Sequence, residues 1–159
     1  MPRRPAAPSP SRPQPRPHRS RDNVRSPLTR GGQVPSPEQV RAVVDDYLAS
    51  FSKKDRNAFL ACFADDAEQV DPVPSPPNVG KEAIGQFWDN VAGMADKMEP
   101  LLDRVHVCGN EAAVVFTMNA RSGEGGSAID IVDIITVNDD GRIASLRAYW
   151  DPAAIRPLT

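Results

Sequence analysis

Residues 129–137 read Ile129-Asp130-Ile131-Val132-Asp133-Ile134-Ile135-Thr136-Val137, and apart from the two aspartates this is the composition of a buried β-strand. A carboxylate that stays charged and unpaired inside such a strand costs on the order of several kcal/mol. Burial raises a carboxyl pKa, so the cheaper outcome is a neutral acid that donates a hydrogen bond into apolar space. Asp130 and Asp133 point to opposite faces of a strand, and the pattern alone does not choose which one is buried.

The first 33 residues differ in composition from the rest of the chain. They hold eight arginines against Asp22 alone, a net charge of +7, which leaves −9 for residues 34–159 of a 159-residue chain whose total is −2. They also hold eight of the 17 prolines and almost no large apolar residues. Such a segment cannot bury enough surface to offset its ordering entropy, so we expect residues 1–35 to be a disordered Pro/Arg-rich tail.

Three interpretations of this tail stay open. It is a basic arm for nucleic acid or anionic surfaces, a targeting peptide, or the product of a start codon placed too far upstream, with Val24 or Val34 as the true first residue. The segment has no apolar h-region, which counts against targeting. We favour the last interpretation, or a plain solvated tail. Because the body of the chain is acidic, we expect no nucleic-acid partner.

Residues 36–152 carry the elements of one compact domain. Ser36-Pro37-Glu38-Gln39 is typical of a helix start, with serine as the cap and glutamine closing a capping box. We expect a first helix to about Lys54, a short helix capped by Asp55, a third helix over Lys81 to Ala92, and strands over 67–71, 101–108, 112–121, 127–137 and 142–150. Helices followed by strands predict an α+β domain, with the helices on one face of an antiparallel sheet. Residues 153–159 are assigned to a C-terminal tail.

Several function classes find no support in the sequence. No apolar stretch approaches the length of a membrane span, so no membrane partner is expected. Cys62 and Cys108 lack metal-ligand spacing and are interpreted as two reduced core thiols of a cytoplasmic protein. His106, in Val105-His106-Val107, is interpreted as a surface strand residue.

The order of elements resembles the cone-shaped α+β fold of the nuclear-transport-factor-2-like superfamily, which includes the SnoaL-like domains, and the motifs look like Δ5-3-ketosteroid isomerase. The stretches that carry the resemblance are Ala42-Val43-Val44-Asp45-Asp46-Tyr47, Phe63-Ala64-Asp65-Asp66-Ala67, Val70-Asp71-Pro72-Val73, Asn110-Glu111-Ala112-Ala113, Phe116-Thr117 and residues 139–148. The resemblance implies three N-terminal helices and a curved antiparallel sheet that enclose an apolar pocket. The family is commonly dimeric, so we expect a homodimer.

The resemblance also implies a catalytic set. The family's oxyanion-hole tyrosine falls on Tyr47, its general base on Asp71 and its protonated aspartic acid on Asp133. The implied reaction moves a double bond of a 3-ketosteroid from Δ5 to Δ4 by intramolecular proton transfer through a dienolate, and it needs no metal or cofactor. Judged by itself, Tyr47 reads as a core tyrosine and Asp71 as a turn carboxylate, so the three residues together carry the assignment.

The pocket requires apolar walls for a small apolar substrate. The candidates are Trp88, Phe116, Met118 and Trp150, and Trp150 ranks highest because its position is aromatic and near the base in the family. Phe87 is better interpreted as core packing. The chain departs from the family at Trp88, where a second tyrosine would hydrogen-bond the catalytic one, and an indole has no hydroxyl to complete that network.

Two other functions stay open. Relatives in polyketide pathways open epoxides, cyclise or dehydrate with paired carboxylates, for which Asp71 with Asp133 or Asp71 with Glu99 are candidates. The same fold also serves as a non-catalytic module that binds apolar ligands, but such binding gives no reason to bury an acid. Tyr47→Phe separates enolate chemistry, which needs the phenol, from a carboxylate pair, which does not.

Overall fold

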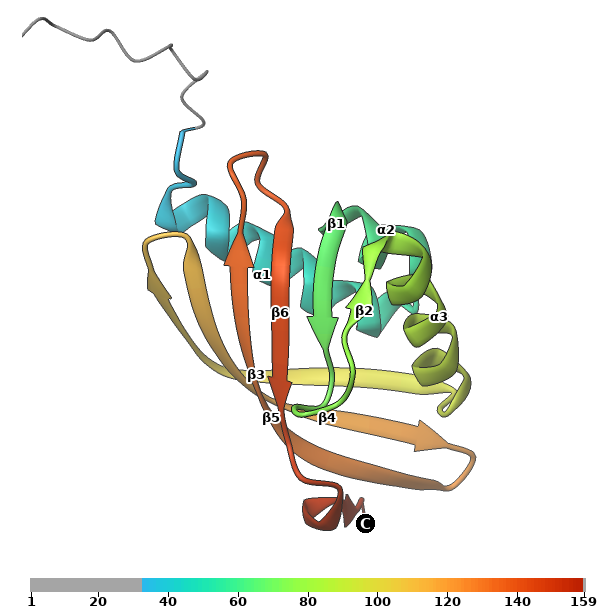
Figure 1. Ribbon diagram of the computed structural model, residues 1–159. Coiled ribbons are helices and arrows are strands. Elements are labelled where there is room, and N and C mark those ends of the chain that lie inside the picture. Colours follow the sequence, from blue (N-terminus) through green and yellow to red (C-terminus); the bar gives the residue numbers. More distant parts are fainter. Residues whose placement is uncertain (1–32, 159) are drawn as a thin grey trace, which may run out of the picture. The chain divides into compact units, whose positions relative to one another are not determined.

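The structure is a computed structural model that describes residues 33–158 (Figure 1). Most of the predicted N-terminal tail, residues 1–32, lies outside the described residues. The helices and strands are α1 (Pro37–Lys53), α2 (Arg56–Ala61), β1 (Phe63–Val70), β2 (Asn78–Val79), α3 (Gly80–Gly93), β3 (Lys97–Cys108), β4 (Glu111–Ser122), β5 (Gly125–Val137), β6 (Ile143–Tyr149), the 3-10 turn η1 (Pro152–Ala154) and β7 (Arg156–Pro157). The predicted helices and strands are all present, and β1 and β3 each begin four residues earlier than expected.

Helix α1 begins and ends where its local chemistry directs. The Ser36 hydroxyl accepts a hydrogen bond from the Gln39 amide at 3.3 Å, and the Gln39 side chain accepts one from the Ser36 amide at 2.8 Å, which confirms the predicted capping box. Lys54 ends the helix with φ 50°, the left-handed conformation common at helix C-termini. The apolar stripe of the helix includes Tyr47 and faces the core.

The sheet is mixed, with strand order β2-β1-β6-β5-β4-β3. Strands β3 to β6 pair antiparallel as predicted, but β1 and β6 pair parallel, with Gln69 opposite Leu146. The expectation of a wholly antiparallel sheet is therefore wrong at this pair. Hairpin reasoning constrains only strands joined by short turns, whereas β1 and β6 are separated by a helix and three long strands.

The end of the chain turns back onto the sheet. Strand β7 pairs antiparallel with the first half of β5, with Ala128 opposite Arg156. Strand β6 pairs with the second half of β5, from Val132 to Val137. The segment that sequence analysis assigned to a C-terminal tail thus continues the same edge of β5, and Figure 1 shows its compact turn at the end of the chain.

The core lies between the helices and the inner face of the sheet. Its centre is a cluster of aromatic rings from the helices and β1, with centroid distances from 4.5 to 6.3 Å, formed by Tyr47, Phe51, Phe59, Phe63 and Trp88. No helix in residues 33–158 is long and apolar enough to cross a membrane.

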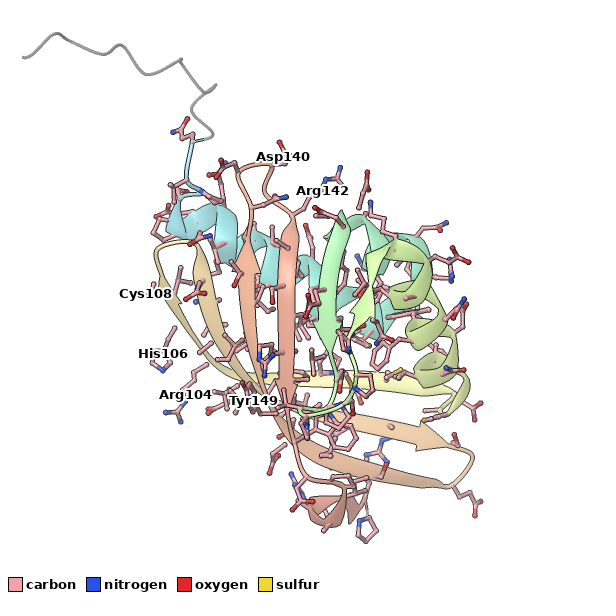
Figure 2. All side chains as sticks on the ribbon, in the orientation of Figure 1. Arg104, His106, Cys108, Asp140, Arg142 and Tyr149 are labelled. Atoms are coloured by element: carbon pink, nitrogen blue, oxygen red, sulfur yellow. The ribbon has the colours of Figure 1, made fainter. Side chains whose placement is uncertain are left out.

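The two cysteines are free and lie in different environments. Cys62 is buried, where desolvation raises its pKa to about 11, as expected of an unreactive core thiol. Cys108 is exposed, so its assignment to the core was wrong. It is the last residue of β3, and side chains near the end of this strand alternate between the core and solvent, with Cys108 on the solvent side. His106 is exposed, as predicted, and Figure 2 shows both residues on the outer side of β3.

Candidate active site

Strand β5 resolves the ambiguity between its two aspartates. Asp133 is 1% exposed on the inner face. Asp130 is exposed on the outer face, where it accepts a hydrogen bond from the Thr117 hydroxyl at 2.6 Å and pairs with the Arg156 guanidinium at 2.8 Å. The residues opposite each of them explain the difference, because Asp133 lies between Val114 and Ala148, both of which are buried.

Asp133 and Tyr47 form a buried polar pair. The Tyr47 hydroxyl donates to Asp133 Oδ2 at 3.0 Å, and the tyrosine is 2% exposed. The other carboxyl oxygen, Oδ1, is buried and has no hydrogen-bond partner among the described residues. Desolvation, reinforced by the nearby Asp71 carboxylate, raises the pKa of Asp133 well above its usual range. Burial, reinforced by the acidic side chains of Asp133 and Asp71, likewise raises the pKa of Tyr47, so the surroundings favour the protonated form of both groups.

Asp71 lies immediately after β1, at the start of the proline-rich loop. Its Oδ1 accepts a hydrogen bond from the Trp150 indole at 2.7 Å. Burial raises the pKa of Asp71, and the indole hydrogen bond opposes that rise because it stabilises the ionised form. Asp71 is half-buried where Asp133 is fully buried, so the two carboxyl groups differ in environment.

Tyr47, Asp71 and Asp133 line one cavity of about 240 Å³ between the helices and the inner face of the sheet. The rest of its wall is almost wholly apolar, and its members are Phe51, Phe87, Val91, Met94, Ala95, Met98, Phe116, Met118, Ala120, Ser127, Ile129, Ile131, Trp150 and Ile155. The cavity thus combines a few convergent polar groups with apolar walls, the usual composition of a small-molecule site.

The structure contradicts the predictions for two adjacent aromatic residues of α3, Phe87 and Trp88. Trp88 is 2% exposed and packs against Phe59 with a centroid distance of 4.5 Å and the rings tilted by 34°, so it belongs to the core and does not line the cavity. Phe87, which sequence analysis assigned to the core, lines the cavity. Successive helix residues point about 100° apart, so only one of the two can face the cavity, and hydrophobicity does not indicate which.

Glu99 also lies elsewhere. Its carboxylate pairs with Lys97 at 3.0 Å on β3 and does not line the cavity, so the structure does not bring Asp71 and Glu99 together. Among residues 33–158, the carboxyl groups that line the cavity are those of Asp71 and Asp133. Within residues 33–158, no group of three or more His, Cys, Asp or Glu side chains is placed to hold a metal ion.

Sequence reasoning missed several wall residues. Ile129 and Ile131 alternate with Asp130 and share the inner face with Asp133, so strand periodicity would have found them once Asp133 was chosen. Met94 follows α3, and Ile155 lies in the segment taken for a tail. Neither carries a sequence signal, because both reach the cavity only through the packing of distant segments.

Three comparisons with known proteins agree with this architecture. Residues 44–146 match the family of SnoaL-like domains. "Steroid Delta-isomerase" from Nocardioides simplex is 32% identical over 114 residues, which span 72% of this chain and 91% of that protein. The crystal structure of RV0760c from Mycobacterium tuberculosis has a TM-score of 0.71 over 78% of this chain and 99% of that chain, at 22% identity, which shows a shared fold. The family match includes Tyr47, Asp71 and Asp133.

Proposed function

The chain belongs to the SnoaL-like domain family of the nuclear-transport-factor-2-like superfamily, and we propose on this premise that it is a steroid Δ-isomerase, moving the double bond of a 3-ketosteroid from Δ5 to Δ4. The observation that carries the proposal is Asp133, 1% exposed, hydrogen-bonded to the Tyr47 hydroxyl and raised in pKa, in the same cavity as Asp71. A buried acid beside a phenol is a costly arrangement, and an enolate oxygen gives it a use.

Asp71 is the proposed general base. In its ionised form it removes a proton from the carbon between the ketone and the double bond, and the electron pair of that C–H bond delocalises onto the carbonyl oxygen to give a dienolate. The raised pKa of Asp71 makes it a stronger base than an ordinary aspartate, while its hydrogen bond from Trp150 favours the ionised form.

Tyr47 and Asp133 are the proposed oxyanion hole. The carboxyl proton of neutral Asp133, on the oxygen that has no partner in the described protein, and the Tyr47 hydroxyl both donate to the developing negative oxygen. Each donor aimed at charge that develops in the transition state typically contributes about 100- to 1,000-fold in rate. In binding, the ketone oxygen takes over the Tyr47 hydrogen bond that Asp133 accepts in the free protein.

Asp71 completes the reaction by returning the proton to the γ carbon of the dienolate, which forms the conjugated enone and restores the ionised base. The Asp71 carboxylate therefore acts in both steps and carries the same proton from the α to the γ carbon. The roles of Asp71 and Asp133 differ because one is accessible enough to ionise and the other is too dry to do so.

The direct test is to mix the protein with a Δ5-3-ketosteroid and follow the ultraviolet absorbance of the conjugated Δ4 product. We expect turnover without any added metal or cofactor. Absence of product at high protein concentration would reject the steroid reaction. Heat-treated protein controls for the spontaneous isomerisation.

A polyketide-tailoring enzyme that opens epoxides, cyclises or dehydrates is the second candidate, because Asp71 and Asp133 line one cavity as a carboxylate pair. Tyr47→Phe distinguishes the two. It removes an oxyanion donor, so steroid isomerisation should fall about 100- to 1,000-fold, whereas epoxide opening between two carboxylates should change little. The third candidate, a non-catalytic binding module, requires that Asp133→Leu leave ligand affinity unaltered and that no reaction be found.

A homodimer is the proposed assembly, formed through the outer face of the sheet. Val132 and Tyr149 are paired there and are 36% and 43% exposed, and Leu101 on the same face is 52% exposed (Figure 2 labels Tyr149). Burying such a group of apolar side chains favours association. Sedimentation equilibrium of the protein and of Val132→Asp tests it, and a monomeric unsubstituted protein would reject the dimer.

A further inference from the structure

The cavity is too small to enclose a four-ring substrate completely. Its volume of about 240 Å³ lies below the roughly 300–1,000 Å³ of pockets that enclose drug-sized ligands. A ligand whose ketone reaches Tyr47 and Asp133 must therefore extend beyond the enclosed part. Two large apolar side chains line the cavity and are nevertheless exposed, Met94 at 77% and Ile155 at 49%. Such side chains at the mouth of an apolar cavity gain most when a ligand covers them.

The position of Ile155 is fixed by its neighbour Arg156, which forms an ion pair with Asp130. Successive residues of an extended segment point to opposite sides, so Arg156 lies on the outer face when Ile155 lines the cavity. There the Arg156 guanidinium donates to both oxygens of Asp130, at 2.8 and 2.9 Å, and the Thr117 hydroxyl donates to the same carboxylate at 2.6 Å. This bidentate geometry fixes both the orientation of the guanidinium and its distance from the carboxylate. The pair therefore positions the backbone that carries Ile155.

The segment around Ile155 is also held at both ends. On one side, the Asp151 carboxylate accepts a hydrogen bond from the Ala153 amide at 2.9 Å and caps η1. On the other, the Leu158 amide donates to the Gly126 carbonyl at 2.9 Å. A Cβ atom at residue 126 would lie 2.8 Å from a backbone carbonyl oxygen of β4 and 3.1 Å from the Leu158 side chain, so glycine permits this close approach.

We propose that residues 151–158 form a specificity wall, in which Ile155, together with Met94, contacts the end of the substrate remote from the reacting ketone. Asp130 and Arg156 are positioning residues that hold Ile155 at the mouth. The inference deepens the proposed function and rests on it for the orientation of the substrate. Asp130, on the outer face of β5, thereby helps to select substrates by the length of their apolar body.

The experiment compares a long and a short substrate in matched variants. The long substrate is androst-5-ene-3,17-dione, and the short one is cyclohex-3-enone, which has the reacting ring and lacks the remote rings. Ile155→Ala should raise KM for the steroid about tenfold, the effect typical of lost apolar contact in a binding site, and leave kcat unchanged. The kcat/KM for cyclohex-3-enone should not change.

Arg156 provides the test of positioning. Arg156→Ala should raise KM for the steroid about threefold, as an exposed ion pair allows, and Arg156→Lys should fall between it and the unsubstituted protein, because lysine keeps the charge without the bidentate geometry. Arg104→Ala is the matched control, since Arg104 forms an exposed ion pair with Asp103 at 2.8 Å and does not line the cavity. Figure 2 shows Arg104 on the outer side of the sheet.

Each outcome decides the proposal. A loss for the steroid alone supports the wall, whereas equal losses for both substrates, or none, overturn it while the isomerase function stands. If the unsubstituted protein isomerises neither substrate, the proposed function fails, and calorimetric titration with androst-4-ene-3,17-dione decides the wall by itself. Binding weakened about tenfold by Ile155→Ala supports it. Unaltered binding, or no binding to the unsubstituted protein, overturns it.

Discussion

Asp130 and Asp133 lie three residues apart on the same strand and have opposite chemistry. On the outer face, hydrogen bonds from Arg156 and Thr117 lower the pKa of Asp130 and keep it ionised. On the inner face, desolvation and the nearby Asp71 carboxylate raise the pKa of Asp133 well above its usual range. The residue type is the same and the strand is the same. The difference teaches that each face of the sheet sets the protonation state, and hence the use, of a carboxyl group.

The two carboxyl groups also make the stability of the fold depend on pH in opposite directions. The folded-state pKa of Asp133 is raised, so its contribution to stability is complete below the pKa of the unfolded chain and is lost as pH rises through the folded-state pKa. The folded-state pKa of Asp130 is lowered, so its contribution is present above the unfolded-state pKa and is lost as pH falls. Solvent screens Asp130, and its contribution is small.

The largest expected effect falls on the inner side of the sheet, at the base. Asp71→Ala removes the group that moves the proton, and kcat for a Δ5-3-ketosteroid should fall by up to about 10⁴-fold, the upper end of what general acid–base catalysis contributes. Asp103→Ala, an exposed carboxylate in an ion pair on β3, is the control and should change kcat little. Absorbance of the conjugated product measures both. A loss of kcat in Asp103→Ala as large as in Asp71→Ala would contradict the assignment of Asp71 as the base.

The next effect compares the two aspartates of β5 directly. Asp133→Leu removes an oxyanion donor and should lower kcat about 100- to 1,000-fold, and Asp133→Asn, which keeps an N–H donor, should lose less. Asp130→Asn weakens the ion pair with Arg156 and should raise KM for the steroid without lowering kcat. Steady-state kinetics separate the two constants. A fall in kcat for Asp130→Asn as large as for Asp133→Leu contradicts the assignment.

The pH dependence of kcat/KM sharpens the contrast between Asp71 and Asp133. The rate should fall as pH drops through a pKa higher than that of an ordinary aspartate, because the base must be ionised and burial raises its pKa. Trp150→Phe removes the hydrogen bond that opposes this rise, so the acid limb should move to higher pH. A pH-rate profile of both proteins measures the shift. A flat acid range would exclude Asp71 as the base.

The smallest expected effect is on stability. Asp133→Asn removes the cost of keeping a buried acid neutral at a pH where the unfolded chain would ionise it, so Tm at pH 7 should rise on the order of 3 °C. The gain should be larger at pH 8 than at pH 5, since the cost grows as pH rises above the unfolded-state pKa. Calorimetric scans of both proteins at the two pH values measure it. If the Tm of Asp133→Asn at pH 8 were lower than that of the unsubstituted protein, the carboxyl group would stabilise the fold and the prediction would be wrong.

Much of the fold could be predicted because it depends on local chemistry. Ser36 and Gln39 begin α1, Asp55 caps α2, and the turn at Asn138–Gly141 joins two long strands. The parallel pairing of β1 with β6 could not be predicted, since it depends on where a long intervening segment returns to the sheet. The return of β7 to β5 was missed for the same reason.

The candidate site divides in the same way. By itself, the sequence determined that a carboxyl group would interrupt an apolar strand, and the resemblance carried by its motifs indicated which residues to group together. The tertiary structure showed that Asp133, the aspartate that the resemblance had indicated, is the buried one. It alone decided that Phe87 lines the cavity where Trp88 does not, and that Ile155 reaches its mouth. The physical reason is that periodicity fixes which residues share a face, whereas burial depends on what packs against that face from elsewhere in the chain.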